Sequence, residues 1–341
     1  MKRVLVIRSG ALGDTVFASS ILPVLQQSCS GEVEIDWLGR KPFTDIFKYD
    51  SRVNRIYSLK HNSIPVWLDA VKLRVIFDSW FNPYDLVVNL ETGSKLSLLM
   101  RLVKAEQKAG VPYHYIEDLQ ETHAVDIVRK ICSRFTDDKY LEYAVPHLYF
   151  QTNMGLLNRF SLERQRYLII HPGISHFNKH DHRAFRSWPM TAWHELIKNL
   201  ILQYTGKVVI IGSASERAYL DCLNDFKTEQ VVFTAGRILL PDLLILIANA
   251  GLLVSTDTGP AHAAAALNTP VIALFGPSSV RTTGPYVSDS NQVAVLSAGL
   301  PCSPCSLTER FKSCKNNLCM KKISVSAVLD AIKNICNTLA I

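Results

Sequence analysis

The sequence lacks any uninterrupted apolar run of the length that crosses a membrane. Its most apolar stretch, residues 238–254, is broken by Pro241, Asp242 and Asn249, whereas a spanning helix needs about 20 consecutive apolar residues. The apolar run near the amino terminus covers only residues 4–7, which is too short for the core of a secretory signal peptide. These absences predict a cytoplasmic protein.

Signatures of nucleic-acid binding are also missing, because no basic stretch is interleaved with aromatic residues. The sequence holds 37 basic and 30 acidic residues, which leaves a net charge of +7 at pH 7. An excess of this size favours a phosphorylated substrate or an anionic membrane surface as the partner. We expect no nucleic-acid partner.

Eight cysteines without a secretory signal indicate reduced thiols. Four of them follow the spacing C-x2-C-x8-C-x4-C, namely Cys302, Cys305, Cys314 and Cys319. Four such thiols can in principle close a tetrahedral zinc site, but this spacing is irregular for a zinc ribbon or finger. We therefore expect no metal and interpret the group as free thiols that brace a loop, with a structural metal site as the alternative.

Short apolar runs rich in β-branched residues alternate with helical patterns along the chain. Strands that are apolar throughout and alternate with helices predict parallel sheets covered on both faces. The series restarts near residue 166, after a polar segment, and a chain of 341 residues is long enough for two domains. The sequence therefore predicts two Rossmann-like, doubly wound α/β domains. The expected strands cover residues 3–8, 33–38, 85–90, 167–171, 207–212, 230–233, 252–255 and 270–276.

The expected domains cover residues 1–155 and 166–322. Apolar residues at helical spacing in residues 324–340 predict a closing helix. We expect this helix, within residues 323–341, to pack back on the first domain. Ligands of doubly wound sheets bind beyond the carboxyl ends of the strands, so functional residues are expected in the loops that follow strands.

The most informative of these loops is "STDTGPAHAAAAL", residues 255–267. A strand, a polar turn and a helix start together form an anion site, because unpaired backbone amides and the helix dipole point at the loop. Thr258 and Gly259 offer such amides to a phosphate, and His262 adds an imidazole donor. Asp257 is interpreted as a helix cap or as an acceptor for a sugar hydroxyl. A capped turn with a structural histidine is the alternative for the whole motif.

A second glycine turn between strand and helix is "RSGALGDTVFASS", residues 8–20. Gly10 and Gly13 let the turn fold tightly. Asp14 has two possible roles. As an N-cap it is purely structural, whereas as a general base it faces an acceptor hydroxyl within hydrogen-bond reach.

Two further loops of the second domain carry candidate ligand contacts. In residues 171–189, Lys179 and Arg186 are cations able to neutralise a diphosphate. In residues 212–220, Glu216 either accepts from a ribose hydroxyl or is a first-turn helix acid that faces water.

Together these stretches resemble the bacterial ADP-heptose:lipopolysaccharide heptosyltransferase family, which is glycosyltransferase family 9. The resemblance covers nearly the whole chain, and its most specific parts are "LVIRSGALGDTVFASSILPVL" and "LLVSTDTGPAHAAAALNTPVIALFGPSS". It implies a GT-B fold, in which two Rossmann-like domains face a central cleft. It also implies inverting transfer of a heptose from ADP-heptose to the inner core of lipopolysaccharide by single displacement, with no required cofactor.

By position, the resemblance makes Asp14 the catalytic base and Glu216 the residue that binds the donor ribose. The family usually has a lysine two places before "WP" that contacts the donor phosphates. This chain has Arg186 there, and Lys179 is the alternative for that contact. The donor-binding signature then consists of Asp257, Thr258, Gly259 and His262.

The resemblance also implies an acceptor site on the first domain and peripheral contact with the inner face of the cytoplasmic membrane. Basic residues in residues 94–108 are candidates for part of that face, and a solvated helix is the alternative. Three competing functions stay open, namely the same fold and mechanism with another nucleotide-sugar donor, a nucleotide-sugar 2-epimerase, and a catalytically silent nucleotide-binding or assembly protein. A dehydrogenase is disfavoured because "GALGD" lacks the full G-x-G-x-x-G spacing.

Overall fold

The computed structural model describes residues 1–341 apart from 30–31, 152, 174–184, 227, 307 and 340–341. The chain divides into two compact units, Met1–Tyr149 and Phe150–Ile341. The division falls just before the polar segment that the sequence suggested as the boundary. Helix α6 (Met154–Arg159) therefore belongs to the second unit.

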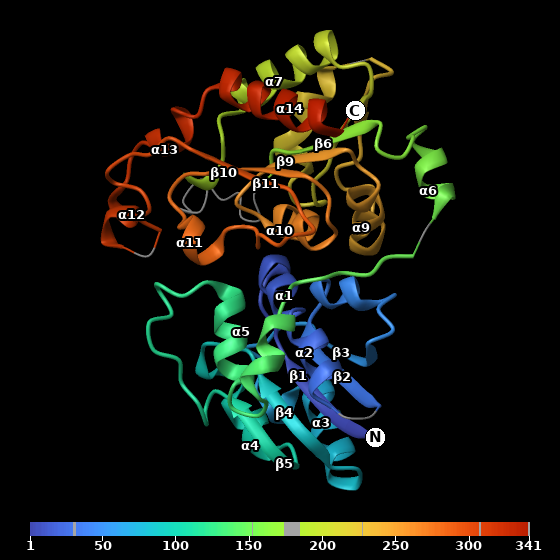
Figure 1. Ribbon diagram of the computed structural model, residues 1–341, viewed down its shortest axis with the longest axis vertical. Helices are drawn as coiled ribbons and strands as arrows, with labels where there is room; N and C mark the ends of the chain where they lie inside the picture. Colours follow the sequence, from blue (N-terminus) through green and yellow to red (C-terminus); the bar gives the residue numbers. More distant parts are fainter. Residues whose placement is uncertain (30–31, 152, 174–184, 227, 307, 340–341) are drawn as a thin grey trace. The chain divides into compact units, whose positions relative to one another are not determined.

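The first unit is built on a parallel sheet whose described strands run in the order β3-β2-β1-β4-β5 (Figure 1). The chain moves outward from β1 to β3 and then returns to place β4 on the other side of β1, so the topological switch point lies between β1 and β4. Its elements are β1 (Lys2–Ile7), α1 (Leu12–Ala18), α2 (Ile21–Ser28), β2 (Val33–Arg40), η1 (Phe43–Phe47), β3 (Val53–Leu59), η2 (Val66–Leu68), α3 (Ala70–Phe81), β4 (Tyr84–Asn89), η3 (Ser94–Leu96), α4 (Ser97–Leu102), β5 (Ala105–Gly110), α5 (Ala124–Cys132) and η4 (Asp138–Tyr143).

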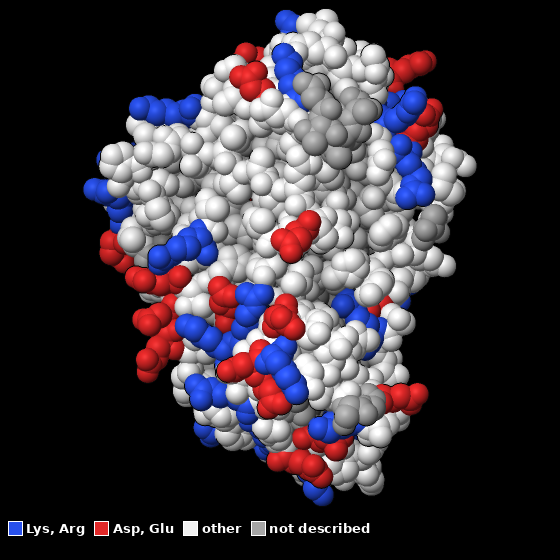
Figure 2. All heavy atoms as spheres, viewed as in Figure 1, with Lys and Arg blue, Asp and Glu red and all other residues white. Residues whose placement is uncertain are grey.

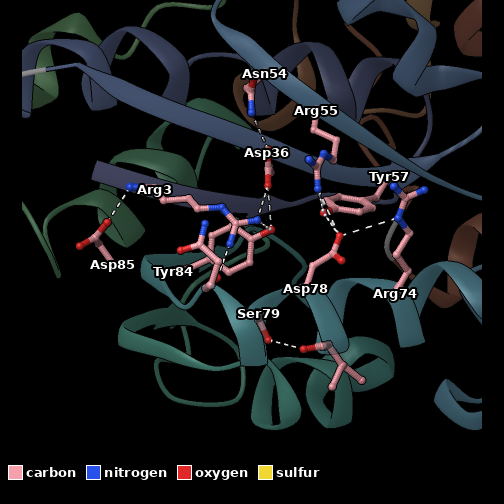
Figure 3. A network of polar contacts seen from close by, with 12 residues as sticks. Arg3, Asp36, Asn54, Arg55, Tyr57, Arg74, Asp78, Ser79, Tyr84 and Asp85 are labelled. Carbon is pink, nitrogen blue, oxygen red and sulfur yellow. Dashed lines mark hydrogen bonds and ion pairs between the residues drawn. The ribbon is translucent and has the colours of Figure 1, made fainter. Parts of the chain in front are cut away.

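A buried polar network ties the three middle strands of this sheet together (Figure 3). Asp36 of β2 accepts hydrogen bonds from Arg3 of β1 at 3.1 Å and from the Tyr84 hydroxyl of β4 at 2.8 Å. A buried carboxylate is costly unless it is paired and hydrogen-bonded. Burial, followed by the charge of Asp36, raises the pKa of Tyr84, so its hydroxyl stays a donor.

The second unit has a parallel sheet whose described strands run in the order β11-β10-β9-β6-β7-β8. Its switch point lies between β6 and β9, and all described residues of both strands are buried. Its elements are α6, β6 (Tyr167–His171), α7 (Met190–Gln203), β7 (Lys207–Ile210), α8 (Arg217–Leu220), η6 (Asp221–Asp225), β8 (Val231–Phe233), α9 (Leu240–Ala248), β9 (Leu252–Thr256), α10 (Gly259–Ala266), β10 (Val271–Phe275), α11 (Val280–Thr283), β11 (Val293–Ser297), α12 (Glu309–Ser313), α13 (Leu318–Lys321) and α14 (Val325–Leu339).

Helix α14 forms where the sequence predicts a closing helix, but its apolar face packs in the second unit. Val328, Ile332 and Ile335 lie in one core cluster with residues of α7, β9 and β10. The Trp188 indole N–H donates to the Ile323 carbonyl at 2.9 Å and fixes the chain just before the helix. Strands and helices of its own unit thus cover the apolar face, and packing of the helix on the first domain stays a prediction.

Charged side chains are mixed on the visible face of the first unit. Figure 2 shows Lys and Arg alternating there with Asp and Glu rather than forming a field of one sign. No helix among the described residues is long and apolar enough to cross a membrane.

Candidate functional site

The carboxyl edge of the second sheet brings together loops from four neighbouring strands. Asp257 and Thr258 follow β9, Ser278 follows β10, His171 ends β6 and Glu216 lies beyond β7. Parallel strands end at the same edge, and the switch point opens a crevice between loops that leave in opposite directions. The sequence-predicted residues of this unit that the structure describes therefore meet where a doubly wound sheet binds its ligand.

Asp257 is the buried anion of this edge, with only 6% of its surface exposed. Its Oδ2 lies 3.4 Å from Arg186 Nη1, and its Oδ1 lies 3.7 Å from His262 Nε2. Burial alone raises the pKa of Asp257, but the hydrogen bond from His262 and the charge of Arg186 outweigh it and lower that pKa, with a further contribution from Ser278. Asp257 is therefore ionised and neutralised by basic neighbours.

The helix-cap interpretation of Asp257 is wrong. Helix α10 begins at Gly259, and its N-cap is Thr258 in an extended conformation. The side chain of Asp257 turns instead to Arg186 and His262. The backbone amides at the start of α10 thus remain at the ligand-facing edge, where an anion is favoured.

Arg186 retains hydrogen-bonding capacity after pairing with Asp257. Its Nε is buried and has no hydrogen-bond partner among the residues that the structure describes. A buried donor of this kind costs free energy unless an acceptor meets it. A ligand phosphate is an acceptor of the right charge. Lys179, the other candidate for this contact, lies outside the described residues.

Glu216 is buried, so the interpretation as an acid facing water is wrong. Its Oε2 accepts from the Ser213 backbone N–H at 2.7 Å and from the Ser213 hydroxyl at 2.6 Å. Its Oε1 lies 3.7 Å from His171 Nε2. Burial raises the pKa of Glu216, but His171 and Ser213 outweigh it and lower the pKa to about 2. A Cβ at Gly173 would clash with Glu216 Oε1, so only glycine permits this approach.

His171 lies at the same edge, and the sequence predicted no ligand-binding role for it. Its Nδ1 lies 3.1 Å from Ser255 Oγ and 3.0 Å from Thr258 Oγ1, and the two hydroxyls are 2.9 Å apart. His171 and Ser255 are paired in the register of β6 and β9. The available signal was position, because His171 is the last residue of the strand beside the switch point.

In the first unit, Asp14 lies at the third position of α1, whose N-cap is Ala11. Asp14 is therefore not the N-cap, but its Oδ2 accepts from the Ala11 N–H at 2.9 Å. A Cβ on Gly10 would lie 2.5 Å from the Cβ and Oδ2 of Asp14. Gly13 is the second residue of α1.

The second oxygen of Asp14, Oδ1, accepts from Arg8 Nη2 at 2.7 Å. Arg8 also donates through Nη1 to the Leu90 carbonyl, across the switch point where Ile7 pairs with Asn89. Arg8 and Asp14 line a cavity together with Leu90 and Thr92 and with apolar side chains of α5. Asp14 is 43% exposed, so its carboxylate is both oriented and accessible.

The four clustered cysteines form no disulfide bond in the described part of the chain. Among the described residues, no group of three His, Cys, Asp or Glu side chains is placed to hold a metal ion. The Cys305 and Ser306 amides donate to the Pro277 carbonyl at 2.8 and 2.9 Å. The segment thus supports the loop that carries Ser278.

Comparisons with known proteins give a consistent result. The sequence model of a family described as glycosyltransferase family 9 (heptosyltransferase) matches residues 81–315, which is more than half of the chain. The chain is 26% identical over 283 residues to lipopolysaccharide heptosyltransferase 3 of Escherichia coli, covering 77% of this chain and 80% of that protein. It is 24% identical over 333 residues to lipopolysaccharide heptosyltransferase 1 of Pseudomonas aeruginosa, covering 89% and 86%.

Solved structures show the same architecture. A family 9 glycosyltransferase from Veillonella parvula has a TM-score of 0.79 at 19% identity, covering 98% of this chain and 97% of that chain. ADP-heptose lps heptosyltransferase II of Escherichia coli has a TM-score of 0.75 at 22% identity, covering 100% of both. These similarities and the two parallel sheets confirm the predicted fold class, GT-B with two Rossmann-like domains.

Proposed function

The chain belongs to glycosyltransferase family 9, the heptosyltransferase family, and is a glycosyltransferase; from this premise we propose that it moves a heptose from ADP-heptose to the inner core of lipopolysaccharide. The observation that carries the proposal is the ionised Asp257 held between Arg186 and His262 at the start of α10. This arrangement keeps two basic side chains at a helix N-terminus, which suits a diphosphate.

In the proposed donor complex, the diphosphate lies at the backbone amides of Thr258 and Gly259 and meets Arg186. Glu216 accepts from the ribose hydroxyls, because its carboxylate is ionised and its Oε1 lies as far as 3.7 Å from His171 Nε2. Asp257 acts through its neighbours by holding Arg186 and His262 in place. These roles keep the donor-binding set that the family resemblance implies, with a counter-ion role for Asp257.

The proposed reaction is a single displacement with Asp14 as general base. Asp14 takes the proton of the acceptor hydroxyl while the hydroxyl oxygen forms a bond to the anomeric carbon. The bond from that carbon to the phosphate oxygen breaks, and ADP leaves with the electron pair of that bond. The configuration at the anomeric carbon is thereby inverted. Arg8 and the Ala11 N–H orient the carboxylate at 2.7 and 2.9 Å.

Charge that develops on the leaving diphosphate is met by Arg186, His262 and the start of α10. Arg186 supplies positive charge, and His262 and the amides of α10 supply hydrogen-bond donors, where other transferases use a metal ion, so we propose that no cofactor is required. Activity that survives exhaustive chelation supports this, whereas activity restored only by added Mg²⁺ or Mn²⁺ contradicts it.

The experiment that tests the function measures ADP release from ADP-heptose with a heptose-deficient lipopolysaccharide acceptor. The matched variants are Asp14→Asn and Asp126→Asn. Asp126 lies at the same position of α5, pairs with Arg129 at 2.6 Å, and is 47% exposed against 43% for Asp14. We expect acceptor-dependent release that falls by roughly 100-fold or more in Asp14→Asn alone, with donor affinity retained.

Three other outcomes contradict parts of the proposal. Release that is unaffected by Asp14→Asn removes Asp14 as the base. Turnover with a UDP- or GDP-sugar and none with ADP-heptose changes the donor. Isomerisation of the donor sugar without any acceptor identifies a nucleotide-sugar 2-epimerase instead.

We further propose that the enzyme works in the cytoplasm, at the inner face of the cytoplasmic membrane. The support is the acceptor named for the relatives, lipopolysaccharide, because this substrate carries lipid chains. The test is cell fractionation at low and at high salt. Recovery of all of the protein in the soluble fraction under both conditions would contradict peripheral attachment.

A further inference from the structure

The first unit exposes a group of large apolar side chains on one short stretch of chain. Trp67 and Leu68 of η2 are 66% and 70% exposed, and Phe81 at the end of α3 is 90% exposed. Phe77 and Trp80 of α3 are more than half exposed. Single exposed apolar residues are ordinary, but a contiguous group marks an interaction surface.

Phe77, Trp80 and Phe81 lie on one side of α3, and Trp67 and Leu68 belong to η2, just before its start. Positions 74, 77 and 81 follow helical spacing and present Arg74, Phe77 and Phe81 on one face of α3. The Phe77 and Trp80 rings lie edge to face with centroids 6.0 Å apart. The Trp80 indole N–H donates to the Leu102 carbonyl at 3.2 Å, which joins α3 to the end of α4.

The opposite side of α3 is occupied by the fold. Val75 and Ile76 are buried in the core of the first unit. Asp78 lies between the two sides, next to Arg74, and Figure 3 shows it meeting Arg55 and Tyr57 of β3. The Asp69 side chain caps the helix start by accepting from the backbone amides of residues 71 and 72. The packing of α3 against the core thus comes from one side of the helix, and Phe77 and Phe81 lie outside that core.

The charges at this surface are basic. Arg74 is exposed on the apolar face, and Arg101 and Lys104 are exposed on either side of Leu102. Asp78, the acid on this helix, is already shared by Arg55 at 3.2 Å and Arg74 at 3.7 Å. Its negative charge is thus largely neutralised within the protein.

We propose that this α3 surface docks on an anionic lipid bilayer. It consists of Trp67, Leu68, Arg74, Phe77, Trp80, Phe81, Arg101, Leu102 and Lys104. Exposed tryptophan and phenylalanine favour the headgroup level of a bilayer, and arginine and lysine beside them meet lipid phosphates. A twofold contact with a second copy would set the same basic residues against each other, which favours the bilayer as the occupant. The inference rests on the proposed function in one respect, since a lipid-bearing acceptor gives such docking a use.

The test is sedimentation of the full-length protein with vesicles of phosphatidylglycerol and phosphatidylethanolamine, against vesicles of phosphatidylcholine alone. We expect binding to the anionic vesicles only, and weakening by salt. The double variant Phe77→Ser/Phe81→Ser should lose roughly tenfold or more of this binding, because it removes two exposed apolar side chains that the bilayer would bury. The variant Arg101→Glu/Lys104→Glu should lose a similar factor at low salt.

Matched controls separate docking from general effects. Tyr115→Ser removes an exposed aromatic residue elsewhere in the first unit, and Lys198→Glu/Lys333→Glu makes the same change of net charge in the second unit. Both controls should bind vesicles as the unmodified protein does. Circular dichroism of each variant checks that it is folded.

Because vesicle binding does not use the enzymatic reaction, its result is independent of the donor and acceptor. Equal binding by Phe77→Ser/Phe81→Ser and the unmodified protein overturns the inference. The inference is also overturned if sedimentation velocity shows that the unmodified protein is a dimer, that Phe77→Ser/Phe81→Ser is a monomer, and that this variant still binds vesicles. Vesicle binding that depends on this surface in a protein that transfers no heptose would contradict the proposed function alone.

Discussion

His171 Nδ1 lies 3.0 Å from the hydroxyl of Thr258, although 87 residues separate the two in the chain. The contact joins the end of β6 to the N-cap of α10. On its other side the same imidazole faces Glu216 at 3.7 Å. One side chain therefore connects the two groups to which we assign the donor phosphate and the donor ribose.

Replacing this imidazole should weaken donor binding more than turnover. His171→Phe keeps the ring volume but removes the hydrogen bonds, so Thr258 and Glu216 lose a shared support. We expect the donor dissociation constant to rise about tenfold, as the loss of about 1.4 kcal/mol implies, with a smaller change in kcat. Calorimetric titration with ADP measures the first quantity.

The matched control for that variant is His61→Phe, which changes an exposed histidine of the first unit. Equal ADP affinity in His171→Phe and the unmodified protein, with both folded, would show that His171 does not position the donor site.

Glu216 should contribute to stability in a pH-dependent way. Its folded pKa of about 2 lies below the ordinary 4.5, so its contribution is full above pH 4.5 and declines as the pH falls toward 2. The difference corresponds to about 3 kcal/mol at neutral pH. Glu216→Gln should lose about that much in the free energy of unfolding at pH 7, and the loss should shrink between pH 4.5 and pH 2. Urea unfolding across this range measures it, and a loss independent of pH would contradict the assigned cause.

Gly10 should be required for the position of Asp14. A Cβ at Gly10 would lie 2.5 Å from the Asp14 side chain, whereas a Cβ at Gly93 meets nothing within 4 Å. Gly10→Ala should therefore lower kcat by roughly tenfold or more while donor affinity is retained, because displacement of a reacting group by about 1 Å is costly. Gly93→Ala should change neither quantity. Steady-state kinetics of both variants measure this, and equal rates would mean that α1 absorbs the added methyl.

The Asp257–Arg186 pair should show a coupling that surface pairs lack. A double-mutant cycle with Asp257→Asn and Arg186→Met, read out as the free energy of unfolding, should give a coupling of about 1 to 3 kcal/mol, since the carboxylate is buried. The exposed pair Arg166–Glu163, at 3.7 Å, is the comparison and should give about 0.5 kcal/mol or less. Coupling energies that do not differ would show that Asp257 is not held by Arg186.

The central strands were predicted correctly because burial on both faces makes them apolar throughout. β1, β4, β6 and β9 all coincide with the expected apolar runs. The missed strands are β3, β5 and β11, which lie at sheet edges. Their burial patterns are mixed because one side of an edge strand meets solvent, so their sequences do not show the continuous apolar signal.

For the candidate site, as for the strands, the sequence pointed to some features and missed others. The sequence pointed to Asp14, Glu216 and the start of α10 because each lies in or just after a polar turn that follows a strand, and glycine or helix-start residues mark such turns. Their roles in donor or acceptor binding stay predictions. The alternatives of a cap for Asp257 and a water-facing position for Glu216 were wrong. The surroundings of Asp257 and Glu216 depend on which side chains from distant loops lie within about 4 Å of each carboxylate. A local sequence pattern does not encode that distance.

The sequence by itself determined the fold class, the alternation of strand and helix and the loops that carry function, since these depend on local polarity and periodicity. Only the tertiary structure decided what each functional side chain contacts. The register of β6 against β9 places His171 beside Ser255. The apolar face of α14 packs in the core of the second unit. Arg186 and His262 lie against the carboxylate of Asp257. Each of these three contacts joins residues that are not neighbours in the chain. Such a contact becomes favourable only when the fold brings the two groups together and removes the water between them.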